Sequence, residues 1–554
     1  MSGTSMTAMS TLAEEFWQWR EATRPDSFDD VCRVRRPSAW VPDWSAAAVE
    51  DRRRVLAGFA GRYSALEDYG APVADQVDRL LVGSALARVH WELNLLRDWQ
   101  RNPGFYLDQS LGPVVNLLLP PPPFTEIRAQ SLVDCLQRVP AVLAAAEENL
   151  AGHAAAPFAR CALLLLEKAS EQLATAMAAL APLLPTAQQR VLQKRTAAAC
   201  SALTSFRIWL GDRLSTFATA TSVGAEAFDF FLHRVALLPY PVEHLRWMGR
   251  QEYQRSTAAE LIMRARHRRS APAPLIADVA QQVSRQREDE SGVRAFCCRR
   301  GLVDLPDDLP HYRNAAMPAY LEPLSWLCVP HHLPSPGCPA GDALRYIRAP
   351  REDLPYFELA EARDPRVGIA HEGVHAWQAA LSSRHPNPVR RHYYDSAANE
   401  GIAFANEEAL LTAGLFDNLP ESSLFVLNAM RLRSLRVEID IGLALGELTI
   451  ETAADRLATS VAMDRRTAWE EAVHFAGHPG QGLSYQTGKQ QVLDLMTACA
   501  HDRPDTFDLA DFHIDLWSDG NVPISLRRWE LLGLSDHVDR ARTLGAGEGP
   551  PVPA

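Results

Sequence analysis

A short segment in the second half of the chain constrains the fold most. It carries the pattern His-Glu-Gly-Val-His, in which His371 and His375 are four residues apart and Glu372 follows the first histidine. Residues four apart lie on one face of an α-helix, so both imidazoles can reach one metal ion. Glu372 lies about 100° further round, close enough to reach a water on that ion. The opposite side of this helix is apolar, with Val374, Trp377 and Leu381. The pattern therefore predicts a buried helix whose histidine face looks into a cleft.

A third ligand is predicted on a second helix. Glu400 comes 25 residues after His375, which leaves room for a helix end, a loop and an incoming helix. Zinc accepts imidazole and carboxylate ligands in a tetrahedral site, and three protein ligands leave one position for a water whose pKa falls to about 7. We therefore predict Zn²⁺ bound by His371, His375 and Glu400, with Glu372 as the catalytic base. Glu407 shares a helix face with Glu400 and is predicted to orient a ligand histidine, with a solvated charge as the alternative.

Two later segments carry further candidates. Arg436 and Asp440 are four apart in a helical pattern. They form either a structural ion pair or a unit in which Arg436 holds a substrate carboxylate and Asp440 supports the site from behind. The loop that starts at His478 is rich in glycine and leads to Gln481 and Tyr485. We predict that Gln481 contacts the substrate and that Tyr485 donates a hydrogen bond to the oxyanion formed at a carbonyl, with a core tyrosine as the alternative.

Apolar residues recur at helical spacing through most of the chain, and strand-like alternation is rare. The best strand runs from Ala343 to Ala349 and ends at Pro350. The sequence predicts a mainly α fold, large and helical, with a small β-sheet and a deep central cleft between two lobes. The strand is expected to pair with an extended substrate, as edge strands do, with Tyr346 in contact with that substrate. Three ranges are expected, namely a helical N-terminal lobe over 1–300, a metal-site lobe over 301–544 and a disordered tail over 545–554.

The overall charge excludes some partners. Lys and Arg number 56 against 68 Asp and Glu, and the net charge of −12 argues against general binding to nucleic acid or to anionic membranes. Nine cysteines are few and odd in number, as expected in a reducing compartment. The first residues lack the regions of a secretory signal, and apolar runs are far shorter than the ~20 residues of a membrane span. We expect a cytoplasmic monomer or homodimer whose partner is a small-molecule or short peptide-like substrate.

Four other histidines lie in segments without helical periodicity. His331 and His332 are close enough to the expected cleft region to border a substrate, but a solvated loop is the favoured interpretation. His385 and His392 follow the first metal helix and are expected to be exposed rather than to bind metal.

Together these segments resemble the bacterial family known as domain of unknown function 885. The family's third-ligand helix typically has the sequence EGWAxYxEE, its arginine helix RxxxDTGLH and its late loop WPGQAxxYxxG. The matching segments are Glu400–Glu408 (EGIAFANEE), Arg436–Ala444 (RVEIDIGLA) and His478–Gly488 (HPGQGLSYQTG). The resemblance spans roughly residues 130–500. It implies a zincin-like fold and a glutamate-ligated, gluzincin-like zinc metallohydrolase.

The chain departs from the family pattern at several positions. The family's histidine helix usually has the sequence HExxPGHHxQ, whereas this chain has HEGVHAWQ, with the ordinary zincin spacing. Ile402, His478 and Ala444 stand where the family has Trp, Trp and His. The metal ligands, the base and Tyr485 are kept while pocket positions differ, so the substrate class is less constrained than the metal site.

These observations predict a zinc-dependent, metallopeptidase-like hydrolase. It would cleave an amide or peptide bond of a small peptide-like substrate through a metal-activated water. The alternative is a specialised biosynthetic tailoring enzyme that uses the same zinc site for cyclisation, deacylation or other C–N bond chemistry. A third hypothesis, a binding scaffold without catalysis, is disfavoured by the intact set of His371, Glu372, His375 and Glu400.

Overall fold

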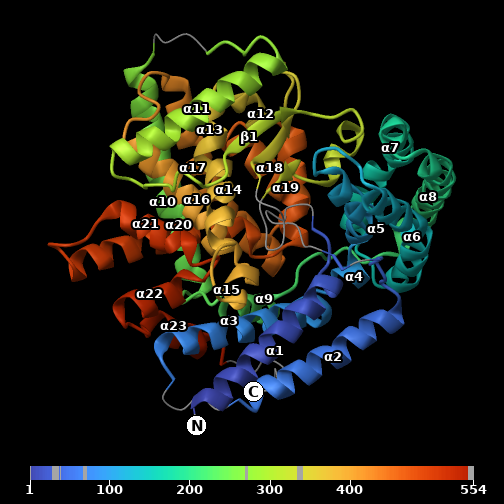
Figure 1. Ribbon diagram of the computed structural model, residues 1–554, viewed down its shortest axis with the longest axis horizontal. Coiled ribbons are helices and arrows are strands. Elements are labelled where there is room, and N and C mark those ends of the chain that lie inside the picture. Colours follow the sequence, from blue (N-terminus) through green and yellow to red (C-terminus); the bar gives the residue numbers. More distant parts are fainter. Residues whose placement is uncertain are drawn as a thin grey trace.

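The computed structural model describes residues 2–27, 36–37, 39–66, 71–268, 273–333 and 341–546 (Figure 1). Helices dominate these residues, and three short strands form one sheet. The predicted mainly α class with a small sheet is thus confirmed. No helix within the described ranges is long and apolar enough to cross a membrane. Most of the predicted tail, from residue 547 to residue 554, lies outside the described residues.

The N-terminal helices surround a large apolar core. In Figure 1, α1 to α3 lie along the bottom of the view and α5 to α8 lie at the right. Thr125 caps the start of α6 by accepting a hydrogen bond from the Arg128 backbone, and Leu132, Leu136 and Leu143 bury the apolar side of that helix. The elements are α1 Ser2–Thr23, α2 Ala46–Ser64, α3 Val73–His90, η1 Trp91–Leu96, α4 Asp98–Arg101, α5 Pro103–Leu118, α6 Glu126–Leu150, α7 Ala156–Leu180, η2 Ala181–Leu183, α8 Thr186–Arg213 and η3 Leu214–Thr216.

The next helices connect this part to the rest of the chain. α10 packs against α17, and α11 packs against β1, although both precede residue 300. The division predicted at residue 300 stays a prediction. The elements are α9 Ala225–Phe230, η4 Phe231–Val235, α10 Val242–Arg266 and α11 Val279–Arg299.

The sheet has the strand order β1-β3-β2. β1 (Tyr312–Ala316) is parallel to β3 (Ala343–Ile347), and β2 (His331–His332) is antiparallel to it. The predicted strand therefore exists as β3, but it is central rather than at an edge. The prediction that it pairs with a substrate backbone is wrong, because β1 and β2 already occupy its two sides.

The predicted substrate contact of Tyr346 is also wrong. Successive side chains of a strand point to opposite faces, and Tyr346 points into the apolar core, where it is 5% exposed. Its hydroxyl donates a hydrogen bond to the Leu119 carbonyl at 2.8 Å. Its neighbour Arg345 points the other way, toward the residues of the candidate site described below.

The remaining helices form the body that carries the histidines, and within it α16 packs against both α14 and α17 (Figure 1). These elements are η5 Glu322–Leu327, α12 Tyr356–Glu361, α13 Pro365–Gly368, η6 Ile369–Gly373, α14 Val374–Ser382, α15 Pro388–His392, α16 Ser396–Thr412, α17 Pro420–Leu445, α18 Ile450–Ser460, α19 Arg465–Gly477, α20 Gln481–Asp502, α21 Leu509–Ser518, α22 Ile524–Leu532 and α23 Asp536–Leu544.

Two glycines let α16 and α20 approach closely. A Cβ atom on Gly488 would lie 1.9 Å from the Ala397 carbonyl oxygen, and one on Gly401 would lie 2.4 Å from the Gly488 carbonyl carbon. No side chain fits at either position without moving a backbone. The contact fixes α20, which carries Tyr485, against α16, which carries Glu400.

Candidate metal centre

The two histidines of the motif lie on one helical segment formed by η6 and α14. His371 is in η6, a π-helical turn. Such turns are rare in proteins, and those that occur are often found at functional sites. Trp377 is fully buried on the opposite side, as predicted. Asn406 of α16 donates a hydrogen bond to the Ala370 carbonyl at 2.9 Å, so the π turn is tied to the helix that carries Glu400.

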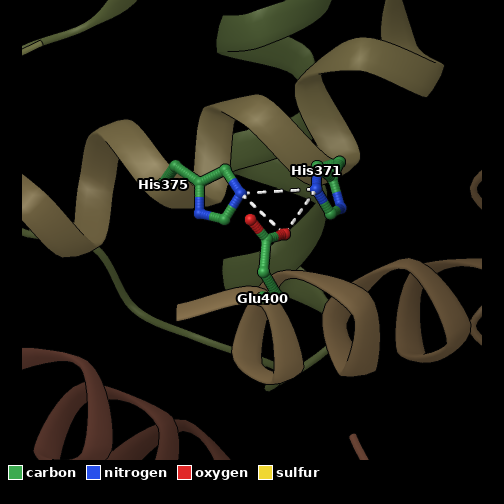
Figure 2. Close-up of side chains that lie close together, drawn as sticks. All are labelled: His371, His375 and Glu400. Atoms are coloured by element: carbon green, nitrogen blue, oxygen red, sulfur yellow. Dashed lines mark hydrogen bonds and ion pairs between the residues drawn. The ribbon is translucent and has the colours of Figure 1, made fainter. Parts of the chain in front are cut away.

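The structure brings the three predicted ligands together. His371 and His375 project from one helix and Glu400 from the helix below, all toward one point (Figure 2). The two Nε2 atoms are 3.3 Å apart. Glu400 Oε2 lies 3.3 Å from Nε2 of His371 and 3.5 Å from Nε2 of His375. All three residues are buried.

These separations fit a tetrahedral zinc site. Ligand atoms at ordinary zinc distances and tetrahedral angles are about 3.3–3.5 Å from one another. Glu400 Oε2 is buried and makes no well-formed hydrogen bond to any described residue, and the two imidazole nitrogens lie beside it. Imidazole ligands favour zinc and similar transition metals over magnesium or calcium. The donor set therefore fits the predicted metal.

Glu407 lies behind His371, as expected for a residue that orients a ligand. His371 Nδ1 is 2.6 Å from Glu407 Oε1, and this contact directs the other ring nitrogen toward Glu400. Arg433 compensates the buried carboxylate, with Nη2 2.9 Å from Oε1 and Nη1 donating to Oε2 at 3.1 Å. Burial raises the pKa of Glu407, but Arg433 and His371 lower it below its ordinary value. Arg433 was not predicted from the sequence. The only sequence pattern that points to it as a site residue is its position three residues before Arg436 on the same helix.

Glu372 lies beside the ligands in a charged setting. His331 of β2 is 5% exposed, and its Nδ1 is 3.7 Å from Glu372 Oε2, so the expected solvated loop is wrong for His331. Burial raises the pKa of Glu372, but the charges of His331, His371 and Arg345 lower it to about 2, and the carboxylate is ionised. Arg345 itself pairs with Glu361 at 2.7 Å. The sequence gives no local signal for this arrangement. β2 and β3 are distant in sequence from the helix formed by η6 and α14, and only the tertiary fold brings them beside it.

Tyr485 lies next to the ligands. Its ring is nearly parallel to that of His371, with centroids 6.2 Å apart. The guanidinium groups of Arg436 and Arg433 lie 4.8 Å and 5.5 Å from its centroid. Arg436 is buried and pairs with Glu471, its Nε donating to Oε2 at 3.1 Å. A role for Arg436 in holding a substrate carboxylate is not favoured, because its guanidinium already has a carboxylate partner.

Asp440 does not pair with Arg436. Its carboxylate accepts hydrogen bonds from the Gly480 backbone at 2.9 Å and from the Leu483 backbone at 2.9 Å. It thus holds the start of α20, where unsatisfied N–H groups attract negative charge. The predicted ion pair with Arg436 is wrong, while support of the site from behind agrees with this contact. Gln481, the first residue of α20, accepts a hydrogen bond from Ser396 Oγ at 2.7 Å.

The two loop histidines are not part of this cluster. His385 is half-buried and lies 3.3 Å from Asp519, and His392 is half-buried and stacks on Trp17. Neither belongs to the group of possible metal ligands within the described residues. Both are thus more enclosed than the sequence predicts.

Comparisons with known proteins give a family and a fold. The family model described as "Bacterial protein of unknown function (DUF885)" matches residues 34–297 and 360–530. No curated protein matches the chain. A solved candidate lipoprotein of unknown function from Shewanella oneidensis is 16% identical, with a TM-score of 0.70 over 95% of this chain and 99% of its own. A candidate lipoprotein from Colwellia psychrerythraea is 15% identical, with a TM-score of 0.70 over 98% and 99%. At these identities the two structures share the fold alone.

Proposed function

We propose that this chain, which belongs to the bacterial family DUF885, is a zinc-dependent hydrolase that cleaves an amide or peptide bond of a small peptide-like substrate. One observation carries the proposal. Two imidazole nitrogens and one carboxylate oxygen, all buried, converge with separations of 3.3–3.5 Å. Zinc held by these three residues would supply a Lewis acid and an open position for water.

Glu372 is proposed as the base. It follows the proposed ligand His371 directly, and its side chain is 25% exposed, so it is less enclosed than the three buried ligands. As an ionised group it can accept a proton from the attacking water and pass it to the leaving nitrogen. Imidazoles are neutral when they bind a metal. Zinc would itself bring positive charge in place of protonated rings, so Glu372 would stay ionised and able to accept that proton.

Tyr485 is proposed to stabilise the oxyanion that forms at the attacked carbonyl. A phenol O–H donates a strong hydrogen bond to such an oxygen. The ring is positioned by His371 on one side and by the guanidinium groups of Arg433 and Arg436. These contacts support a fixed ring whose hydroxyl needs little reorganisation during the reaction.

The proposal includes the finer features predicted from the sequence. A zincin-like arrangement is supported by the histidine helix facing the glutamate helix, and a cleft between two lobes would admit the substrate. A cytoplasmic location and a monomeric or homodimeric state are expected but rest on the sequence alone.

The test combines metal analysis with turnover. Purified protein should contain about one zinc per chain, and it should hydrolyse some member of a library of dipeptides and N-acyl amino-acid amides. Glu372→Gln should keep the zinc and lose activity by roughly 100-fold or more. Glu352→Gln, an exposed acid with a side chain 71% exposed, is the matched control and should act like the wild type. Lack of stoichiometric zinc, or equal activity in Glu372→Gln and wild type, would refute the proposal.

A further inference from the structure

A cavity of about 300 Å³ separates the N-terminal helices from the helices that carry the candidate site. One wall comes from α1, α3, η1 and α4, and the other from α14, α19 and the start of α20. Its volume is at the lower end of the range for pockets that bind small molecules. A compact ligand would fit it better than a long peptide.

The cavity begins about one helical turn from the metal ligands. Ala379 and Ser382 line it, and they lie four and seven residues after His375, on the same face of α14. Gln481 also lines it and lies four residues before Tyr485 on α20. Two helices therefore connect the cavity wall to the side chains proposed to do chemistry, although none of those side chains lines the cavity itself.

Aromatic side chains form much of the wall. Trp17, Trp99, Phe105 and Tyr394 all line the cavity. Trp17 stacks on His392 at 5.9 Å, and its indole nitrogen is buried with no hydrogen-bond partner among the described residues. Such walls suit a flat apolar group.

Three arginines gather on one side of the cavity. Arg20, Arg24 and Arg88 all line it, and the charges of Arg24 and Arg88 both act on Arg20. Glu92 satisfies Arg20 through two hydrogen bonds of 2.9 and 3.0 Å. The Nη2 atom of Arg88 is buried without a hydrogen-bond partner in the described parts of the chain, and the carboxylate beside it, Asp395 Oδ1, is 3.9 Å away. Among the described residues, Arg88 thus has only this long ion pair with a carboxylate, and its side chain is 26% exposed.

Acids also line the cavity, but three have known partners, and one of these is Glu92, which pairs with Arg20. Asp26 pairs with Arg36, and Asp98 pairs with Arg101. Glu21 and Asp108 line the cavity as well. The structure therefore favours an anion at the Arg88 side rather than over the whole wall.

Arg88 also lies near the metal ligands. Asp395 caps the start of α16, five residues before Glu400, which is about 7.5 Å along a helix axis. Arg88 thus lies beside the start of the helix that carries Glu400.

We propose that this cavity binds a small carboxylate-bearing amide with a flat apolar side group, such as an N-acyl aromatic amino acid or a dipeptide ending in one. The carboxylate pairs with Arg88, the side group packs against Trp17, and the amide lies toward His375 and Tyr485. The proposal deepens the proposed function and, for the placement of the amide, rests on it. It also moves carboxylate recognition from Arg436 to Arg88.

Binding is measured in zinc-loaded Glu372→Gln, which should not turn the probes over. The probes are N-acetyl-L-phenylalanine and its neutral methyl ester, followed by calorimetry. The acid should bind roughly 10- to 100-fold more tightly than the ester, as expected for a hydrogen-bonded charge pair. Arg88→Gln should abolish this preference and Arg88→Lys should keep part of it. Arg54→Gln, at an exposed arginine of α2, is the control and should bind as the parent does.

Because a carboxylate can also bind zinc, the comparison is repeated after chelation. A preference that survives chelation and is lost in Arg88→Gln supports the proposal. If Glu372→Gln binds the acid and the ester with equal affinity, the proposal is refuted. This measurement needs only the parent protein, so it is decisive even if Arg88→Gln does not fold. A preference that disappears on chelation and persists in Arg88→Gln also refutes it. Acid-selective binding without any hydrolysis by the wild type would leave this inference standing and would remove the proposed function.

Discussion

Replacing Gly488 by alanine tests how tightly the site depends on the crossing of α16 and α20. The new Cβ would lie 1.9 Å from the Ala397 carbonyl oxygen and 2.8 Å from its carbon, whereas real Cβ contacts are essentially never under 3.0 Å. The two helices must therefore separate by about 1.1 Å or more. Ala397 is three residues before Glu400, and metal ligands tolerate displacements of only about 0.2 Å.

The expected result is loss of stability together with weaker zinc binding. Overpacking of this kind costs about 1–3 kcal/mol, and here both contacting groups are backbone, which cannot rotate away. If α16 moves, Glu400 leaves the ligand triangle; if α20 moves, Tyr485 shifts relative to His371. Urea unfolding followed by circular dichroism gives the midpoint, and zinc per chain after dialysis gives metal retention.

Gly292→Ala is the matched control. Gly292 is an exposed glycine inside α11, and no heavy atom lies within 4 Å of its Cβ position. Helix propensity alone should raise stability there by up to about 1 kcal/mol. If Gly488→Ala unfolds at the same urea concentration as Gly292→Ala and keeps its zinc, the reasoning about the helix crossing is wrong.

Three further predictions concern the charges and the metal. Glu407→Gln should weaken zinc binding roughly 10- to 100-fold in competition with a chelator, because the Nδ1–H of His371 loses its carboxylate acceptor; an unchanged affinity would contradict this role. Arg433→Met should lower stability by about 3–5 kcal/mol in urea, since a buried carboxylate loses its cation, while Arg54→Met on the surface should change little. Wild-type protein held at a free zinc concentration 1,000 times its dissociation constant should lose about 4 kcal/mol of stability when a chelator removes the zinc, and its melting temperature should fall. The His375→Ala variant should show no such response.

The parts of the site that follow local geometry were predictable from the sequence. His371 and His375 share a helix face because they are four residues apart, and Glu400 could be placed because a loop and a new helix start precede it. Their convergence within 3.5 Å agrees with that interpretation. The pairing of Arg433 with Glu407 was not predictable, because the two residues come from different helices and no short spacing relates them.

The strand errors have a similar cause. β1 and β2 are short and lie among prolines, so alternation could not identify them, and without them β3 looked like an edge. Whether Tyr346 or Arg345 faces the site depends on one residue of register, which the neighbouring strands fix. Local patterns therefore predicted the strand β3. They did not predict its neighbouring strands or which of its faces points toward the site.

Helix α17 shows why local and tertiary preferences differ within one site. Arg433, Arg436 and Asp440 follow one another at three and four residues, on one face of the helix. In isolation Arg436 and Asp440 would pair. In the fold, Asp440 instead accepts backbone hydrogen bonds at the start of α20, which releases Arg436 to pair with Glu471 beside Tyr485. Arg433 contacts His371 both through Glu407 and directly, with Nη2 3.4 Å from Nδ1 of His371. One helix face thus positions a proposed ligand, the proposed oxyanion donor and the helix that carries that donor, so a substitution on this face should affect metal binding and catalysis together.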